Sequence, residues 1–319
     1  MRCVCCHHEE FSYQYTLRDL SFGEDGEWEF VCCHQCGHGF LSPIPTEEQL
    51  VTLYTNLYSK EKKEQMINMG KGEFDQGLQR RRARMLAESL GEQDIRCIVD
   101  VGCGMGFSLE KLVKKWPSSR NIGLEMSPIA AEEAKKIEGM EIHHLSFQQA
   151  IQNQIWNRGQ VDIITMNHVV EHLIDPKVDL QKSYEQLRPN GVLLIEIPHL
   201  DGWGRRWMKK WWWGHLPPQH IHLFTVTGIA QMLQEIGYTI VSKERHGYPL
   251  IFLFTWVLFL RGTIGGLSSF RSSRMMKYAA ILIGIFFSPL IIILDLFVTT
   301  FMNMKQGDLI TIVARKEVD

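Results

Sequence analysis

The sequence predicts an α/β fold with a mostly parallel β-sheet and helices on both of its faces. Residues 96–247 alternate short apolar runs with helical patterns, and a glycine-rich turn follows the first run. The composition, 45% hydrophobic and 22% charged, is ordinary for a globular protein. The predicted strands are Cys97–Val101, Asn121–Leu124, Glu141–His144, Asp162–Met166 and Val192–Ile197, and the helices between them include Phe107–Trp116 and Pro128–Glu138.

Composition also divides the 319 residues into segments. Residues 1–45 are rich in Cys, His and Gly, and residues 46–95 form a polar, helix-prone linker. The α/β core takes residues 96–247 and returns at 305–319, where the last strand is expected. Between these two parts lies an overwhelmingly apolar insertion, residues 248–304.

Six of the eight cysteines fall in the first 36 residues. Residues 1–5 contain no apolar stretch, so we expect no secretory leader and a reducing compartment, where clustered cysteines favour a metal over disulfides. Two CxxC pairs, Cys3 with Cys6 and Cys33 with Cys36, fit a structural tetrahedral zinc site, because each pair offers two thiolates on one side. Buried or redox cysteines are the alternative, and spare donors leave the ligand choice open: Cys5, Cys32, His7, His34 and His38.

The most informative segment is an apolar strand that runs into alternate glycines and then a helix, with the pattern D-x-G-x-G-x-G from Asp100 to Gly106. Glycine is needed where the backbone passes close to a ligand or adopts a positive φ. The free N–H groups of the helix that follows face such a ligand. The third glycine comes one residue too early for the dinucleotide fingerprint G-x-G-x-x-G.

This pattern resembles the first motif of the class I S-adenosylmethionine (SAM) methyltransferases. The resemblance implies a Rossmann-like, seven-stranded, mostly parallel sheet, and an acidic residue after the second strand that binds both ribose hydroxyls. Glu125 stands there, and a carboxylate can accept two hydroxyl protons. The alternative is a strand–helix turn without a ligand. The resemblance assigns the following residues to the cofactor: Asp100, Gly102, Cys103, Gly104, Gly106, Glu125, Met126 and Asn167.

Two further turns extend the resemblance to small-molecule O-methyltransferases related to the enzymes of ubiquinone biosynthesis. Residues 171–176 (EHLIDP) are similar to their E-H-x-x-D-P turn, and residues 187–191 (LRPNG) to their L-x-P-G-G turn. Asn190 replaces the first glycine and tolerates a left-handed conformation. Zinc ribbons followed by a P-x-P segment, here residues 43–45, precede methyltransferases of this type. Phe147 follows the third strand, where the family often has an acidic residue, and would either stack on adenine or join the core.

The sulfonium of SAM is intrinsically reactive, so the protein mainly aligns the acceptor and removes its proton if the acceptor is a hydroxyl. Histidine is the simplest base near pH 7. His220, in a segment similar to the family's P-x-H-x-x-x-F, is the first candidate, and His172 and then His168 follow. A structural hydrogen-bonding role is the alternative for each, and a divalent ion at the turn formed by Glu171 and His172 is a further one.

The tryptophan-rich segment 205–213 (RRWMKKWWW) mixes cations with aromatic rings. Three consecutive tryptophans point three ways, which a helical core cannot absorb, so we expect a cap over the acceptor site at a membrane interface. In the insertion, the uncharged stretch 248–260 is too short to cross a bilayer and 278–294 is near the lower limit. A two-span hairpin would place the basic residues 261–277 outside, against the positive-inside rule. We therefore expect monotopic association, with two buried helices of a soluble core as the alternative.

These observations predict a SAM-dependent methyltransferase that acts on a hydroxyl of a lipid-linked, glycan or quinone-like acceptor. We expect it in the cytoplasm, peripheral or monotopic at the cytoplasmic membrane. A catalytically silent SAM-binding scaffold of an envelope glycan pathway is one alternative, and an RNA or protein methyltransferase is the other. A net charge of -2 argues against a wholly basic nucleic-acid binder, so no nucleic-acid partner is expected. The sequence sets neither the acceptor's identity nor the oligomeric state.

Overall fold

The computed structural model describes residues 2–19, 26–46, 48–50, 73–247 and 307–317. The apolar insertion expected at 248–304, with its interfacial membrane segments, lies outside the described residues, as does the stretch 51–72 of the expected linker. Within the described ranges, no helix has both the length and the apolar character needed to cross a bilayer.

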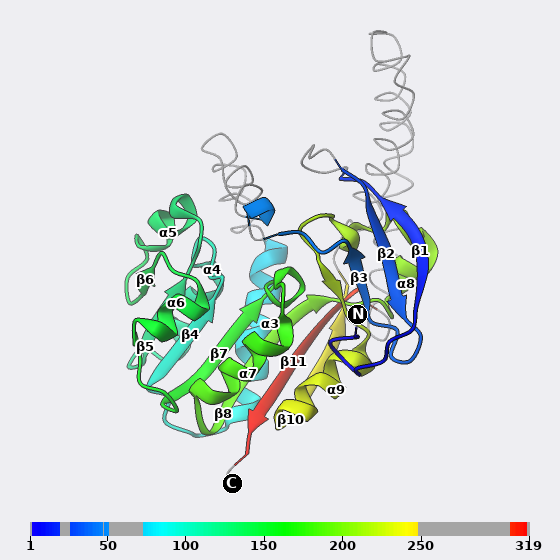
Figure 1. Ribbon diagram of the computed structural model, residues 1–319. Coiled ribbons are helices and arrows are strands. Elements are labelled where there is room, and N and C mark those ends of the chain that lie inside the picture. Colours follow the sequence, from blue (N-terminus) through cyan, green and yellow to red (C-terminus); the bar gives the residue numbers. More distant parts are fainter. Residues whose placement is uncertain (1, 20–25, 47, 51–72, 248–306, 318–319) are drawn as a thin grey trace, which may run out of the picture.

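A seven-stranded sheet forms the centre of the protein, in the order β10–β11–β8–β7–β4–β5–β6 (Figure 1). β11 runs antiparallel to both of its neighbours, and the other pairings are parallel. This arrangement confirms the predicted fold class. The strands are β4 (Cys97–Val101), β5 (Arg120–Leu124), β6 (Glu141–His143), β7 (Val161–Asn167), β8 (Leu187–Pro198), β10 (Tyr238–His246) and β11 (Leu309–Lys316).

The strand order reverses between β4 and β7, because the chain adds β5 and β6 on one side of β4 and the remaining strands on the other. At such a switch point the loops diverge and leave a crevice at the carboxyl ends of the strands, where ligands bind. The loops after β4, β5 and β7 therefore form the expected ligand-binding edge.

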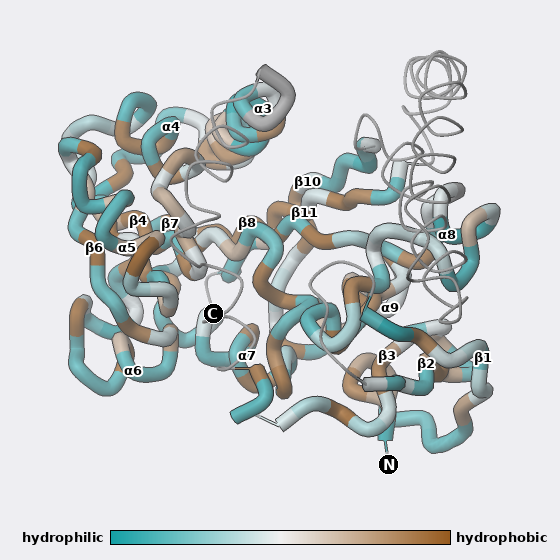
Figure 2. The backbone as a smooth tube through the Cα atoms, turned by 90° about the horizontal axis from the view of Figure 1, so that it is seen from above, coloured by the Kyte–Doolittle hydropathy of each residue, from teal (hydrophilic) through white to brown (hydrophobic). Residues whose placement is uncertain are grey.

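Helices cover both faces of the sheet because alternate strand residues point to opposite sides. Ile98 and Ile163 pack on one face with α3 and α4, while Val99 and Ile164 pack on the other with α6, α7 and α9. Figure 2 shows hydrophobic residues along the central strands and hydrophilic ones on the outer loops. The helices are α3 (Glu73–Leu90), α4 (Phe107–Lys115), α5 (Pro128–Ala134), α6 (Phe147–Gln152), α7 (Pro176–Gln186) and α9 (Val226–Ile236).

Local sequence explains where several of these helices begin. Ser127, Ser146 and Thr225 each accept a backbone N–H from the first turn of the helix that follows, which satisfies a donor left free at a helix start. Directly after Ser146, Phe147 is buried and stacks on Trp156 with ring centroids 6.1 Å apart. Phe147 is therefore a core residue, and the alternative of adenine stacking is not what the structure shows.

A second, antiparallel sheet has the order β1–β2–β3–β9. Three of its strands come from the cysteine-rich N-terminus: β1 (Phe11–Leu17), β2 (Trp28–Cys33) and β3 (Gly39–Ser42). The fourth, β9 (His222–Leu223), comes from the α/β core at residues 96–247. In this strand, Leu223 pairs with Gly39 of β3. The N-terminal strands lie beside α8 (Trp203–Met208) (Figure 1). Main-chain hydrogen bonds between β3 and β9 join them to the main body.

Candidate functional site

The glycine loop after β4 adopts a conformation that requires glycine. Gly102, Gly104 and Gly106 have φ values of 66°, 55° and 84°, all in the left-handed region that L side chains rarely occupy. A Cβ on Gly102 would lie 2.7 Å from the Cγ2 atom of Val169, which belongs to the turn after β7. The loop therefore leads into α4 and packs directly against the loop that carries the histidine candidates.

Glu125 follows β5 and ties the glycine loop to the next helix. Its Oε2 accepts the backbone N–H of Gly104 at 2.8 Å, and its Oε1 accepts that of Ser127 at 2.7 Å. Burial raises the pKa of this carboxyl, while the hydrogen bonds from the backbone oppose that rise. Each carboxylate oxygen has a second lone pair, so Glu125 can accept two ribose hydroxyls while it holds the loop.

Two polar residues occupy the carboxyl ends of the central strands. Asp100 is buried, and its Oδ1 accepts the hydroxyl of Thr165 at 2.6 Å. Burial raises the pKa of Asp100 to about 6. Asn167, at the end of β7, has a buried side-chain oxygen with no hydrogen-bond partner within the part of the chain described. A buried acceptor of this kind is costly unless a ligand satisfies it, which favours a donor-bearing cofactor at this edge.

Cys103 and Met126, also assigned to the cofactor, differ in exposure. Cys103 is buried, and its Sγ lies 2.8 Å from the place where a Cβ on Gly123 would stand. Only its backbone can therefore meet a ligand. Met126 is 58% exposed at the start of the loop after Glu125, so its side chain is available to cover one.

Beyond β7, His168 lies between two buried carboxylates. Its Nδ1 is 3.2 Å from Oε1 of Glu171, and its Nε2 is 3.5 Å from Oε1 of Glu196. Arg82 of α3 also donates a hydrogen bond to Glu196. Burial opposes the charged imidazole, but the two carboxylates outweigh it and raise the pKa of His168 to about 9. A histidine that is protonated at neutral pH stabilises this network, and the catalytic role of His168 stays a prediction.

The same network gives a pH dependence of stability. The folded pKa of His168 is raised, so its contribution is fully present below its unfolded value of about 6.5 and is lost as the pH rises through about 9. Glu171 and Glu196 have lowered pKa values, so their contributions are lost only in acid. We expect the urea midpoint to fall between pH 6.5 and 9, and His168→Gln to weaken that fall. An equal slope in both proteins would contradict the assignment.

His172 and His220 form a second pair beside Glu171. The Nδ1 of His172 lies 2.9 Å from the carbonyl oxygen of Gln219, and that of His220 lies 2.7 Å from the carbonyl oxygen of Gly214. Burial lowers the pKa of both imidazoles, that of His220 to about 3, so both are neutral at pH 7. Two of the three predicted catalytic histidines are thus brought together, and His168 contacts them through Glu171.

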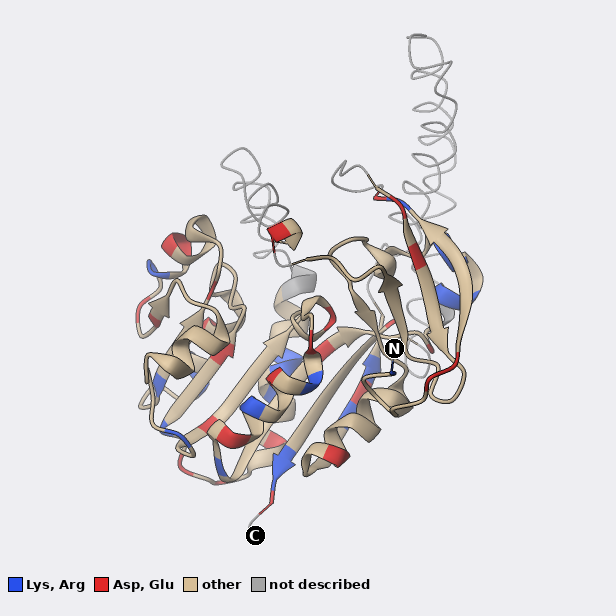
Figure 3. Ribbon diagram, in the orientation of Figure 1, with Lys and Arg blue, Asp and Glu red and all other residues tan. Residues whose placement is uncertain are grey.

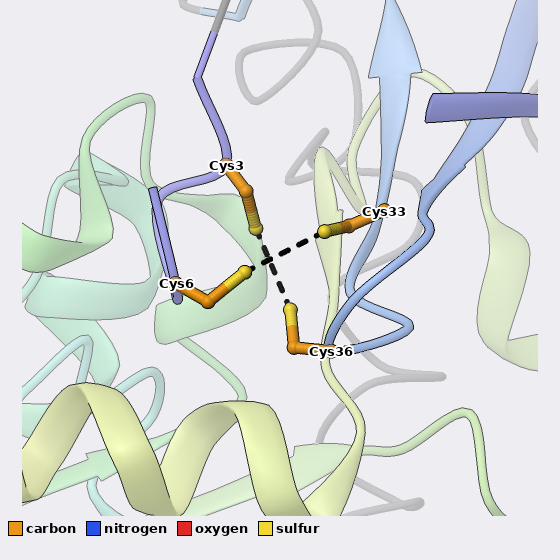
Figure 4. Close-up of side chains that lie close together, drawn as sticks. All are labelled: Cys3, Cys6, Cys33 and Cys36. Atoms are coloured by element: carbon orange, nitrogen blue, oxygen red, sulfur yellow. Dashed lines mark hydrogen bonds between the residues drawn. The ribbon is translucent and has the colours of Figure 1, made fainter. Parts of the chain in front are cut away.

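The four predicted zinc ligands converge on one point (Figure 4). The Sγ atoms of Cys3 and Cys36, and those of Cys6 and Cys33, are each 3.5 Å apart. A tetrahedral site with Zn–S bonds of about 2.3 Å has sulfur atoms about 3.8 Å apart, so the spacing fits zinc closely.

The two CxxC segments also share one backbone pattern. The carbonyl oxygen of the first cysteine accepts the N–H four residues later, at 2.9 Å for His7 and 3.0 Å for Gly37. Both of these residues have positive φ values, 60° and 70°. Each of these two equivalent turns places its two thiols on one side, as the spacing predicts.

The cysteine cluster contacts the segment that carries the histidine candidates. His38 lies between them, with its Nδ1 3.6 Å from Sγ of Cys3 and its Nε2 3.2 Å from Nδ1 of His222. The hydroxyl of Thr225 donates to the carbonyl oxygen of Cys36 at 2.7 Å. The cysteine-rich N-terminal segment and the segment around His222 and Thr225 are therefore packed together.

The tryptophan segment corrects one expectation. Trp212 is almost fully buried, in a cluster with Phe30, Leu41 and Leu223, so this residue belongs to a core and not to an exposed cap. The short turns that follow α8, η2 (Lys209–Trp211) and η3 (Trp213–His215), break the helical spacing and allow the burial. Trp207, in contrast, is 75% exposed.

An open cleft of about 720 Å³ lies at the opposite edge of the sheet. Its lining includes Cys97 and Arg120, which begin β4 and β5. Ligands of open α/β sheets bind at the carboxyl edge. We therefore place the reaction at the glycine loop and not at this cleft.

A doubly wound sheet with one antiparallel strand, a glycine loop after its first strand and a carboxylate after its second define a class I SAM-dependent methyltransferase. The family profile of the methyltransferase domain matches residues 71–243, more than half of the sequence, and the chain belongs to this family.

Similar proteins agree with this class. Trans-aconitate 2-methyltransferase of Azoarcus sp. is 32% identical over 118 residues, 37% of this chain and 45% of that protein. Tocopherol O-methyltransferase of Arabidopsis thaliana is 29% identical over 133 residues, 38% of each chain. The chain thus matches less than half of the length of these two relatives. The structure of 1,6-didemethyltoxoflavin-N1-methyltransferase from Burkholderia thailandensis, with bound S-adenosylhomocysteine, has a TM-score of 0.52 at 13% identity, covering 92% of this chain and 97% of that one.

Sequence reasoning missed the charged residues that hold the site together. Arg82 lies in a basic run of the expected linker. Glu196 lies in the run 192–197 of β8, where all other residues are apolar. Both are buried. A lone carboxylate in a buried strand needs a partner, and this signal could have identified Glu196 but not the helix that supplies Arg82.

Proposed function

We propose that this methyltransferase transfers the methyl group of SAM to a hydroxyl of a small, amphiphilic acceptor. The observation that carries the proposal is the cluster of Glu171, His172 and His220, whose donor atoms lie within 4.8 Å of one another. The turn that bears Glu171 begins beside Val169, which packs against the glycine loop. A site able to activate an oxygen nucleophile thus adjoins the SAM loop.

The amphiphilic character of the acceptor rests on the position of the apolar insertion. Its flanking residues, His246 and Leu309, pair with each other, and Leu309 also pairs with Pro198 at the carboxyl end of β8. The insertion therefore begins and ends at the edge that carries the site. The name of the tocopherol relative also supports an acceptor hydroxyl on a lipid.

The test is incubation of the purified protein with methyl-labelled SAM and with separate lipid, glycan and RNA extracts, read by mass spectrometry. We expect the label in lipid-linked, glycan or quinone-like molecules. Positive and negative residues are interspersed along the whole described part of the chain (Figure 3). This distribution gives no support to RNA as the substrate. Labelled RNA alone would overturn the proposal, and SAM binding without turnover of any extract would favour the scaffold alternative.

His220→Ala is expected to lower kcat by about 10²–10⁴-fold, the range found when assistance to proton removal from the acceptor is lost, and to leave SAM affinity intact. His220 is our first candidate for activating the acceptor, and His172 is the second. His199→Ala, at a buried histidine outside the cluster, is the matched control. Wild-type turnover and SAM affinity in His220→Ala would make His220 structural and move the role to His172.

We further propose that Cys3, Cys6, Cys33 and Cys36 hold a structural zinc ion, because four thiolates leave no position open for a substrate. Cys36→Ser is expected to lose this zinc and to unfold at a lower temperature than the wild type. Cys97→Ser, outside the cluster, is expected to keep it. Elemental analysis of untagged protein measures the metal. Less than about a tenth of an equivalent of zinc, with all eight thiols open to titration, would refute the site.

For location, we propose monotopic association with the cytoplasmic membrane through residues 248–304. The apolar composition of this segment and the basic residues between its two apolar stretches support this arrangement. The full chain is expected to pellet with membranes and to need detergent for release. A cysteine introduced at Ser268 is expected to be labelled from the cytoplasmic side alone. Labelling from outside, or complete solubility without detergent, would contradict the proposal.

A further inference from the structure

Three side chains with metal-binding chemistry meet beside the cofactor loop. Glu171 and His172 lie in the short helix η1 (Val170–His172) after β7, and His220 lies just before β9. One donor atom of each residue lies within 4.8 Å of those of the other two. The backbone N–H of Ile221 donates to the carbonyl oxygen of Glu171 at 2.9 Å, so the two segments are fixed to each other.

Backbone hydrogen bonds fix the Nδ1 atoms of the two imidazoles. Each Nδ1 lies within hydrogen-bond distance of a backbone carbonyl oxygen, that of Gln219 for His172 and that of Gly214 for His220. A carbonyl oxygen only accepts, so each Nδ1 carries the proton and each Nε2 carries the lone pair. Proteins fix the tautomer and direction of metal-binding histidines in this way.

The side chain of Glu171 gives an independent observation that favours a cation at this cluster. It is fully buried, and its Oε1 is already hydrogen bonded to Nδ1 of His168. Its Oε2 is buried with no hydrogen-bond partner in the described part of the chain. A carboxylate oxygen removed from water without a partner costs several kcal/mol, and a cation beside it removes that cost.

We propose that Glu171, His172 and His220 bind a divalent transition-metal ion of the zinc class, separate from the cysteine site. Two imidazoles and one carboxylate suit such an ion and leave coordination positions open, unlike four thiolates. This inference deepens the proposed function. The role of the ion rests on that function, because the open coordination position would take the acceptor hydroxyl.

In that role an ion held by Glu171, His172 and His220 would make the proton of a bound acceptor hydroxyl more acidic. The hydroxyl loses its proton to water. The oxygen then forms a bond to the methyl carbon of SAM, while the bond from that carbon to sulfur breaks and its electron pair remains on sulfur. The products are the methyl ether and S-adenosylhomocysteine, with one proton released.

The test is a titration of the untagged full chain with cobalt(II), after the cysteine site has been filled with zinc. We expect one further equivalent to bind, with the weak absorption of nitrogen and oxygen ligands and without the intense charge-transfer bands of thiolates. Glu171→Gln and His220→Asn are expected to lower cobalt affinity by at least tenfold. His215→Asn, at another buried histidine, is expected to leave it unchanged, with circular dichroism to confirm folding.

Absence of a further equivalent in the wild type would overturn the proposal, even if the variants do not fold. So would thiolate-type absorption alone, or wild-type affinity in both folded cluster variants. Methyl transfer is assayed separately on the same preparations. Cobalt binding without any methyl transfer would contradict the proposed function and leave the metal site standing, whereas methyl transfer that persists without a bound ion would overturn the catalytic role of the ion.

Discussion

Glu125→Ala is expected to lower the affinity of the protein for SAM at least tenfold. The substitution removes a carboxylate that we assign to both ribose hydroxyls, and hydrogen bonds to charged groups contribute about 1.5–3 kcal/mol each. It also frees the backbone N–H groups of Gly104 and Ser127, which Glu125 now accepts, so the loop loses its fixed position. Isothermal calorimetry with SAM measures the change.

The control is Glu132→Ala, on the exposed surface of α5 and seven residues along the chain. It is expected to keep wild-type affinity. Glu125→Gln retains one oxygen acceptor, so its SAM affinity should lie between that of Glu125→Ala and that of the wild type. If folded Glu125→Ala binds SAM as the wild type does, the nucleotide lies elsewhere, and the assignment of the glycine loop fails with it.

Arg82→Met is expected to lower the free energy of unfolding by about 3–5 kcal/mol, the loss found when one partner of a buried ion pair is removed. Arg82 donates a hydrogen bond to Glu196, which is completely buried, and the methionine leaves that carboxylate without its cation from α3. His168 and His246 also face Glu196, so part of the compensation remains. Urea denaturation followed by circular dichroism measures the loss.

The matched control is Arg84→Met on the same helix. Arg84 pairs with Glu244 at 3.3 Å, but its side chain is 57% exposed. Exposed pairs contribute about 0–1 kcal/mol because water screens them. Equal losses in the two variants would mean that the buried network does not stabilise the fold as described.

Sequence alone predicts those parts of the structure that local chemistry determines. Gly102, Gly104 and Gly106 have the positive φ values that glycine permits, and Asn190, at φ 63°, takes the left-handed conformation expected of it. The paired CxxC turns follow from their own spacing. Each of these features depends on residues close together in the chain, so a short window is enough.

The remaining features depend on long-range contacts. Nothing near Arg82 indicates that it reaches Glu196, more than a hundred positions away. The burial of Trp212 likewise depends on Phe30 and Leu41 from the ribbon, so its own neighbours suggest a surface residue. The meeting of His172 with His220 requires the chain to return past η1 before β9.

The pairing of β3 with β9 has a consequence for how the protein can be divided. A fragment without the first 45 residues would leave β9 as an open strand edge, and Trp212 and Leu223 would lose the apolar partners that now cover them. Open edges next to apolar surface invite intermolecular pairing. Such a fragment should self-associate rather than report on the isolated catalytic core, so exchanging ribbons between related chains requires exchanging residues 200–225 as well.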